Sequence, residues 1–386
     1  MNRDLLSGEY KRFPKHWEVI SFTKAFKDMT GGQTKIPKGD YLESGDIPII
    51  DQGQDLIGGY TNERQAVCDI RLPCVVFGDH TKIFKFVTKP FALGADGVKV
   101  LSEANNIDPK FAYYFLNTLN LPDVGYSRHF RFLKRTFFPL PPLEEQQRIA
   151  AILDKADGVR RKRKEAIRLT EELLRSTFLE MFGDPVTNPK GWEVVKLGSL
   201  VVGQLNNGIF KKNHEYGGDT PVVWVKELFS GYTIDCSESR TLTPTDEEVK
   251  KFGLTKGDIL FCRSSLNREG IGFNNVFDGM DFSALFECHI IRVSLNQRKV
   301  NSIFLNYLLR FPGLRKQIIA KANTVTMSTI GQSEIKKIEF YLPPKELQDK
   351  FEIFLRKIAT NRTKLENKES ENLFNSLLQR AFRGEL

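Results

Sequence analysis

Two stretches of the chain share one pattern: residues 134–146 read KRTFFPLPPLEEQ, and residues 336–348 read KKIEFYLPPKELQ. Both fit the frame basic-basic-x-x-Phe-x-Leu-Pro-Pro-x-Glu-x-Gln. Proline presets the backbone for the first turn of a helix, and a glutamate in that turn interacts favourably with the helix dipole. Each stretch therefore predicts the start of a helix, and the repetition predicts a chain made of two related halves.

A second repeated motif, here called the head motif, opens each half. Residues 14–19 read PKHWEV and residues 189–194 read PKGWEV. The match extends backward to Ser7-Gly8-Glu9 and Phe182-Gly183-Asp184, and residues 382–386 close the chain with a similar FRGEL. This order of motifs predicts pseudo-twofold symmetry, with the two ends of the chain close together.

Long helices are expected after both Pro-Pro pairs, over about residues 144–180 and 346–382. Apolar side chains there alternate at spacings of three and four, which is typical of two helices packed along their length. The expected seam residues are Ile149, Ile152, Ala156, Val159, Ala166, Thr170 and Leu173 in the first helix and Leu347, Phe351, Phe354, Ile358, Asn361 and Leu365 in the second. We expect Ile149, Ile152 and Ala156 to face Phe351, Phe354 and Ile358. The alternative is that each helix packs on a globular core.

The regions between the repeated motifs, residues 20–133 and 195–335, show no convincing alignment with each other. Strand-like runs occur at residues 47–50, 74–77, 97–101, 221–225, 258–262 and 289–293, and helical runs at 111–119 and 303–310. The mixture indicates an α+β fold. Because the repeated motifs are shared while the regions between them differ, we expect two recognition modules with different specificities.

The composition favours a nucleic-acid partner. The 386 residues include 57 Lys and Arg against 48 Asp and Glu, a net charge of +9, and the length allows two or three domains. The five cysteines are scattered without a CxxC pair, which argues against a disulfide framework or a zinc site. No apolar run is long enough for a membrane helix and no signal peptide is evident, so we expect a cytoplasmic protein.

Motifs for methyl transfer, DNA cleavage or ATP hydrolysis are missing. A base methyltransferase needs an Asn/Asp-Pro-Pro-aromatic turn, but Leu140 and Leu342 precede the two proline pairs. Pro122-Asp123 lacks the Glu-x-Lys or Asp-x-Lys that should follow in a nuclease, and no GxxxxGK[ST] loop occurs. The histidines show no metal-ligand spacing. We therefore expect no catalytic residue and no metal site in this chain.

Glycine-rich loops carry the residue types that read DNA. Arg, Lys, Asn and Gln pair with guanine and adenine edges in the major groove, and glycine lets backbone amides approach phosphate. Any single loop of this kind can be an ordinary solvated turn, but together they favour DNA recognition. The candidate DNA-binding residues are Lys35, Gln52, Gln54, His80, Lys82, Arg128, Arg131, Lys211, Lys212, Asn213, Arg263, Ser264 and Arg268.

With these motifs in order, the whole chain resembles the specificity subunits of type I restriction-modification systems. The resemblance rests on the two heads, the two Pro-Pro frames, the closing FRGEL, and the phrases GDIP, FGDHT and KGDIL at residues 45–48, 77–81 and 256–260. It implies two α/β target-recognition domains, at residues 1–140 and 184–341. Two long antiparallel helices, at residues 141–183 and 342–386, would form a coiled-coil-like spacer between them.

The resemblance also implies partners. Each domain would read half of a split double-stranded DNA target, and the helices would dock two methyltransferase (modification) subunits, joined by a restriction/translocase subunit. The helix residues expected to bind these partners are Ile149, Ile152, Leu153, Phe351, Phe354 and Leu355. S-adenosylmethionine, ATP and Mg²⁺ would belong to the partners, and this chain would bind no cofactor. A specificity subunit for a fused type II-like enzyme, or a DNA-acting enzyme with an unrecognised site, stays open.

Overall fold

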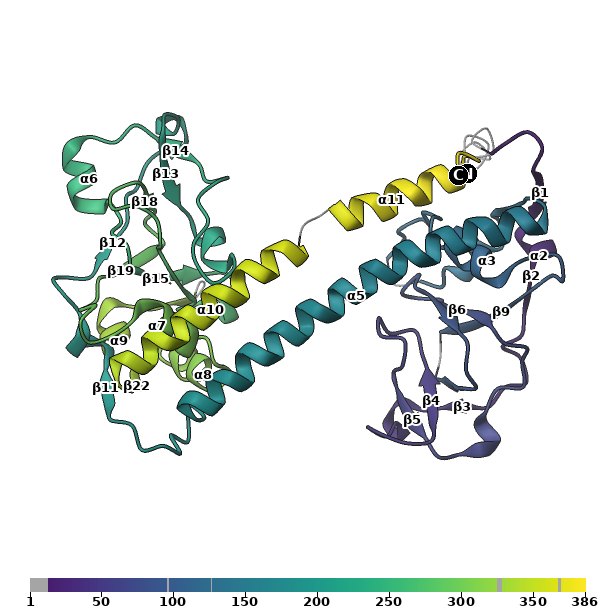
Figure 1. Cartoon of the computed structure of the whole chain (residues 1–386), viewed down its shortest axis with the longest axis horizontal. Helices are drawn as coiled ribbons and strands as arrows, with labels where there is room; N and C mark the ends of the chain where they lie inside the picture. Colours follow the sequence, from purple (N-terminus) through teal and green to yellow (C-terminus); the bar gives the residue numbers. More distant parts are fainter. Residues whose placement is uncertain (1–12, 96, 126, 325–327, 367–368) are drawn as a thin grey trace. The chain divides into compact units, whose positions relative to one another are not determined.

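The computed structural model describes residues 13–95, 97–125, 127–324, 328–366 and 369–386. The chain divides into two compact units, of which the first combines residues 1–164 with 367–386 and the second holds residues 165–366. Helix α5 (Leu143–Phe182) crosses this division, as the teal helix in Figure 1 shows. The helices predicted as separate spacer segments therefore contribute residues to both units.

The first unit contains two four-stranded sheets. One has the antiparallel order β2 (Phe26–Asp28), β9 (Val98–Glu103), β6 (Cys74–Gly78), β7 (Phe84–Val87). The other has the order β3 (Lys35–Ile36), β8 (Ala92–Gly94), β4 (Ile47–Ile50), β5 (Gly59–Thr61), in which β8 runs parallel to β3 and β4. Its helices are α2 (Phe22–Ala25), α3 (Pro109–Leu116), α4 (Phe130–Leu133) and α11 (Glu369–Ala381).

The second unit repeats this arrangement. One sheet has the antiparallel order β12 (Asn206–Asn207), β19 (Ile290–Val293), β15 (Ile259–Cys262), β17 (Asn274–Val276). Another has the order β14 (Thr241–Leu242), β13 (Thr220–Val223), β18 (Leu285–Phe286), with β13 and β18 parallel, and a third joins β16 (Ser264–Ser265), β21 (Ser328–Thr329) and β20 (Asn323–Thr324). Its helices are α6 (Asp246–Phe252), α7 (Ser302–Leu309), α8 (Pro312–Ala320), α9 (Gln332–Lys336) and α10 (Lys345–Glu366).

The two variable regions therefore share a topology that the residues alone did not reveal. Each unit has a four-stranded antiparallel sheet and a second sheet that contains a parallel pair, β4–β8 in the first and β13–β18 in the second. The second sheet has four strands in the first unit and three in the second. The strands predicted around residues 47–50, 74–77, 258–262 and 289–293 are confirmed as β4, β6, β15 and β19.

The repeated motifs recur because they bind each other. The strand that follows each tryptophan of the head motif, β1 (Glu18–Ser21) or β11 (Val194–Lys196), pairs with the strand that leads into Pro-Pro, β10 (Phe137–Leu140) or β22 (Glu339–Tyr341). Each head motif is therefore joined by a strand ladder to the Pro-Pro frame of its own half.

The glutamine of each Pro-Pro frame is fully buried and clamps a helix cap. Gln146 accepts a hydrogen bond from Asp108 N at 2.8 Å and donates to the carbonyl oxygen of Pro141 at 2.8 Å. Gln348 does the same with Asn301 N at 2.8 Å and with Pro343 O at 2.7 Å. Asp108 and Asn301 in turn cap helices α3 and α7, so the two clamps are equivalent.

The closing motif packs on the first head motif. Gly183 and Gly384 both have positive φ, +79° and +70°, and a Cβ atom on either would collide with a proline of a head motif, Pro189 or Pro14. Glycine suits both positions, because it adopts a positive φ without strain and has no Cβ atom to collide with the proline. The predicted closure is thus seen at Gly384 and Pro14, whereas residues 7–9 lie outside the described residues.

The predicted heptad seam is wrong in its middle and in its partners. Val159 and Leu173 are each 51% exposed. Ile149 belongs to the core of the first unit with Phe374 of α11, and Phe351 of α10 belongs to the core of the second unit. Each end of α5 packs on the core of one unit, which is the alternative given above for these helices. Its buried residues lie at the two ends, where they face those cores, and do not form one continuous stripe along the helix.

Helix pairing is nevertheless present within each unit. In the second unit Phe182 packs on Phe351 with ring centroids 5.6 Å apart, and Glu171 pairs with Arg362 at 2.7 Å, which makes α5 and α10 antiparallel. In the first unit Arg160 of α5 pairs with Glu371 of α11 at 3.3 Å. Polar pairs thus occupy the stretch where an apolar seam was expected.

Candidate nucleic-acid interface

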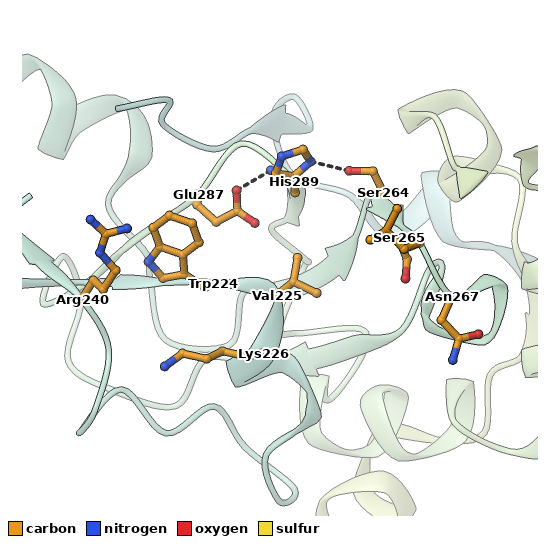
Figure 2. Close-up of a pocket in the computed structure, with 10 residues that line it drawn as sticks. Trp224, Val225, Lys226, Arg240, Ser264, Ser265, Asn267, Glu287 and His289 are labelled. Carbon is orange, nitrogen blue, oxygen red and sulfur yellow. Dashed lines mark hydrogen bonds between the residues drawn. The ribbon is translucent and has the colours of Figure 1, made fainter. Parts of the chain in front are cut away.

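Three strand ends of the second unit converge on a pocket. Trp224 follows β13, Arg263 follows β15 and Glu287 follows β18. The Arg263 N–H donates to His289 O at 2.7 Å, which continues the ladder between β15 and β19. Figure 2 shows Trp224 and Arg240 on one side and the serine loop on the other. The pocket encloses about 520 Å³ and is lined by Trp224, Val225, Lys226, Arg240, Ser264, Ser265, Leu266, Asn267, Glu287 and His289.

The guanidinium of Arg240 is held in place by aromatic rings. It lies 3.9 Å from the ring centroid of Tyr216 and 5.1 Å from that of Trp224, and it donates to Asn213 Oδ1 at 3.3 Å. A cation fixed in this way is ready to meet a phosphate or a guanine without losing much side-chain freedom.

The opposite side of the pocket is fixed by a serine–histidine pair. The hydroxyl of Ser264 lies 2.5 Å from Nδ1 of His289. Because Ser264 belongs to β16, which pairs with β21, the loop that follows is anchored on a sheet. At its tip Leu266 is 88% exposed.

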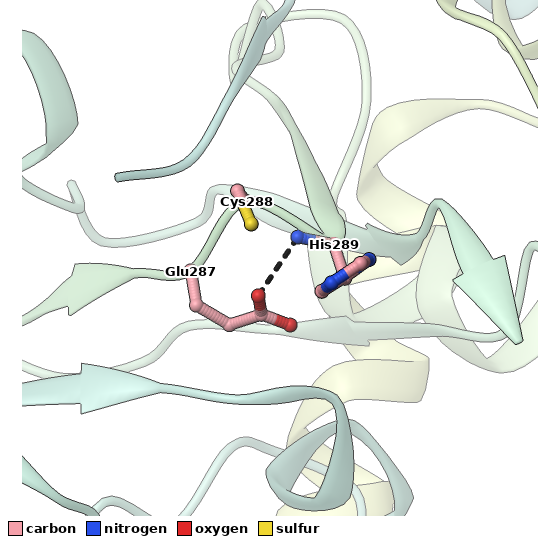
Figure 3. A group of neighbouring side chains, drawn as sticks. All are labelled: Glu287, Cys288 and His289. Atoms are coloured by element: carbon pink, nitrogen blue, oxygen red, sulfur yellow. Dashed lines mark hydrogen bonds between the residues drawn. The ribbon is translucent and has the colours of Figure 1, made fainter. Parts of the chain in front are cut away.

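Glu287, Cys288 and His289 bring three ligand-type atoms within 4.8 Å of one another (Figure 3). Glu287 Oε2 accepts the backbone N–H of His289 at 2.8 Å, and His289 Nδ1 is engaged by Ser264. Burial and the neighbouring Glu287 raise the pKa of Cys288, so its thiol is a poor metal ligand. We interpret Glu287 and His289 as polar lining of the pocket, with Cys288 between them in the chain.

The first unit builds an equivalent site from other side chains. Asp79 follows β6 and its N–H donates to Gly97 O at 2.7 Å, which matches the Arg263–His289 bond of the second unit. Gln52 follows β4, and a Cβ on Gly97 would lie 2.7 Å from Gln52 Oε1 and 2.8 Å from His80 Cδ2. Two of the predicted DNA-binding residues, Gln52 and His80, therefore meet at this site.

Below that site lies an ion pair that sequence reasoning missed. The carboxylate of Asp51 is 3.4 Å from Nζ of Lys85, and both side chains are buried. Lys38 approaches the same carboxylate at 3.9 Å. Burial lowers the pKa of Lys85 while Asp51 opposes that shift. The pair supports the end of β4, from which Gln52 follows.

The other predicted DNA-binding residues are placed less uniformly. Lys211 is engaged by Glu248 at 2.8 Å and by Glu215 at 3.6 Å, and Lys82 by Asp123 at 3.4 Å. Ser264 lines the pocket of the second unit. The exposed candidates are Lys35, Gln54, Arg128, Arg131, Lys212, Asn213, Arg263 and Arg268.

Four of the six predicted partner-binding residues are corrected by their burial. Ile149, Leu153, Phe351 and Leu355 are at most 2% exposed inside the cores of the units, so they offer no docking surface. Ile152 and Phe354 are half-buried. The hydrophobic pattern identified helix positions correctly but could not tell a core-facing side chain from a partner-facing one.

Trp224, Arg240, Glu287 and His289 are among the pocket residues that the sequence did not identify. They come from separate segments and meet only because β13 and β18 are neighbours in the sheet. One signal was present, since Trp224 is the tryptophan without a counterpart in the first half.

Among the described residues, no helix has the length and apolar character to cross a membrane.

Similar proteins share this architecture along most of the chain. A specificity subunit of the type I restriction enzyme MjaIX from Methanocaldococcus jannaschii is 24% identical, over 88% of this chain and 86% of its own length. The EcoR124I/EcoR124II specificity subunit from Escherichia coli is 24% identical over 79% of this chain and 76% of its own. The crystal structure of a type I S subunit from M. genitalium has the same fold, with a TM-score of 0.62 at 15% identity, over 95% of this chain and 96% of that one.

The family described as the type I restriction modification DNA specificity domain matches twice, over residues 14–169 and 189–374. These matches cover both head motifs and both Pro-Pro frames. The two matches also contain the converging strand ends of both units. This chain therefore belongs to the type I restriction-modification DNA specificity family.

Proposed function

We propose that the chain is the DNA specificity subunit of a type I restriction-modification enzyme, with each unit reading one half of a split target. The observation that carries this is the pair of equivalent sites built from different side chains. Where the second unit places Ser264 and His289, the first places His80 and Gly97. A shared backbone with exchanged side chains is what two readers of different sequences require.

Catalysis and cofactors belong to partner subunits in this proposal. We propose that two modification subunits, with S-adenosylmethionine, dock on the helices, and that a restriction/translocase subunit adds ATP and Mg²⁺. Exposed apolar side chains on these helices support a docking role: Leu169 and Leu173 on α5 are 50% and 51% exposed, and Ile353 on α10 is 69% exposed. We therefore propose these exposed residues as the docking surface, in place of the four predicted partner-binding residues that are buried.

The experiment is methylome sequencing of a host that expresses the chain with its modification subunits. A two-part motif with an unspecified gap should appear, and it should vanish when this chain is removed. The double variant Leu169→Asp, Leu173→Asp should abolish co-purification of the modification subunit, while the exposed Lys162→Asp should not. A continuous motif, or methylation that persists without this chain, would overturn the proposal.

A further inference from the structure

Glu287 is a buried carboxylate in the pocket of the second unit, and no lysine or arginine of the described residues pairs with it. It is 3% exposed, and within the described part of the chain no Lys or Arg nitrogen lies within 4.0 Å of its oxygens. It accepts the backbone N–H of His289 at 2.8 Å and that of Val225, it contacts the thiol of Cys288, and the imidazole of His289 lies nearby. A buried acid that no lysine or arginine neutralises costs stability, and such groups gather at functional sites.

The first unit has the same strand pairing as the second but no carboxylate at the position equivalent to Glu287. Leu93 pairs with Ile50, and Phe286 pairs with Val223, so Gly94 and Glu287 follow equivalent paired residues. Gly94 has no side chain to offer. The carboxylate that the first unit does place near this point, Asp51, is neutralised by Lys85 at 3.4 Å. The carboxylate of Glu287 is left without such a partner.

An ionised carboxylate only accepts hydrogen bonds, which restricts what it can select in a DNA groove. Cytosine N4 and adenine N6 donate in the major groove, whereas guanine O6, guanine N7 and thymine O4 accept and would be repelled. The cations Arg240 and Lys226 line the same pocket and favour the approach of the DNA backbone. Because a carboxylate repels phosphate and accepts from amino groups, Glu287 suits a base edge better than a phosphate.

We infer that Glu287 makes the second unit select one base of its half-site by that base's exocyclic amino group, which belongs to cytosine or adenine. This inference rests on the proposed function, because it names what one pocket of the specificity subunit reads. Burial raises the pKa of Glu287, whereas the backbone N–H groups of His289 and Val225 oppose that shift by stabilising the ionised form.

Two matched variants separate base selection from folding. Glu287→Gln keeps the size of the side chain and one acceptor oxygen but removes the charge. Glu227→Gln is the control, because Glu227 is also buried (7%), accepts the Trp224 N–H at 2.9 Å, and does not line the pocket. We expect thermal unfolding of Glu287→Gln to occur at the wild-type temperature or above it.

The measurement is binding of the complete complex to duplexes of the motif found by methylome sequencing. In each duplex one cytosine is replaced by 2-pyrimidinone, or one adenine by purine, so that a single amino group is deleted. At one position of the half-site read by the second unit, the deletion should weaken wild-type binding on the order of tenfold. It should weaken binding by Glu287→Gln little, and binding by Glu227→Gln as much as wild type.

Each outcome decides the matter. If the sensitive analogue is 2-pyrimidinone the base is cytosine, and if it is purine the base is adenine. Equal losses for wild type and Glu287→Gln at every position would overturn the inference and leave the proposed function intact. Absence of any two-part motif for the wild-type complex would instead refute the proposed function.

Discussion

The buried glutamines of the Pro-Pro frames show how one side chain can organise a unit. Gln146 and Gln348 each join the Pro-Pro turn to the cap of a helix by hydrogen bonds in a fully buried place. Removing the amide leaves a buried N–H and a carbonyl without a partner, which costs more than the bond itself contributes.

We therefore expect Gln146→Leu and Gln348→Leu each to lower the free energy of unfolding by about 2–4 kcal/mol. Urea unfolding curves measure the change. The neighbouring Gln147 is exposed, so Gln147→Leu is the control and should change stability by less than about 0.5 kcal/mol. Equal losses of unfolding free energy for Gln146→Leu and Gln147→Leu would contradict a stabilising role for the buried hydrogen bonds of Gln146.

Glu103 makes the stability of the first unit depend on pH. Burial raises its pKa to about 7, because the ionised form is poorly solvated. A raised folded-state pKa contributes stability that is complete below the unfolded value near 4.5 and is lost as the pH rises through about 7.

Glu103→Gln should therefore gain stability relative to wild type between pH 5 and 8, by up to about 3 kcal/mol. Thermal unfolding of both proteins across that range provides the comparison. A constant difference between the two at all pH values would show that Glu103 keeps an ordinary pKa.

Lys211 and Lys212 are adjacent in sequence but differ in what surrounds them. Lys211 is already neutralised by Glu248 and Glu215, whereas Lys212 is exposed. Lys212→Ala should weaken DNA binding similarly on all sequences and make the salt slope shallower by about one unit, while Lys211→Ala should leave the slope nearly unchanged. Titration at several salt concentrations tests this; identical slopes for both variants would exclude the phosphate contact.

At the scale of elements, α5 is the segment most open to redesign. It has 40 residues, and side chains around Lys162 and Lys164 are exposed. Each of its ends packs in the core of one unit, and between them α5 pairs with α11 through Arg160–Glu371 and with α10 through Glu171–Arg362. An insertion of about a whole turn therefore keeps the same faces of α5 toward both cores and both helices.

A four-residue insertion at this point adds about 6 Å and nearly one whole turn. If α5 sets the spacing of the half-sites, the preferred gap in the DNA target should grow by one or two base pairs, because base pairs rise about 3.4 Å each. A library of gap lengths measures the preference. A two-residue insertion would rotate one end by about 200° and should damage folding. An unchanged gap in a folded, active four-residue variant would mean that the helix is not the ruler.

At the scale of the whole molecule, the two units should be exchangeable readers. Residues 20–133 lie in the first unit, between the motifs that build its frame. Replacing them with the equivalent region of a relative should change one half of the methylated motif and leave the other half as it was. A change in both halves, or in neither, would show that the units do not read independently.

The sequence by itself determined the two-part organisation, the start of both long helices and six of the strands, β4, β6, β9, β13, β15 and β19. It could do so because the repeated motifs are local and bind each other: β1 pairs with β10, and β11 with β22. Such motifs must be preserved together, so they remain visible as a repeat. The same local pattern could not show which face of α5 is buried, since apolar side chains in a core and on a surface share one spacing.

Only the tertiary structure decided which side chains form each site. Trp224 and Glu287 are far apart in the chain and meet because parallel strands bring their carboxyl ends together. The structure also decided which carboxylates pair with a cationic side chain, since Asp51 pairs with Lys85 whereas no lysine or arginine of the described residues pairs with Glu287. Charge pairing depends on distances between segments, and those distances are set by the packing of the sheets rather than by the order of residues.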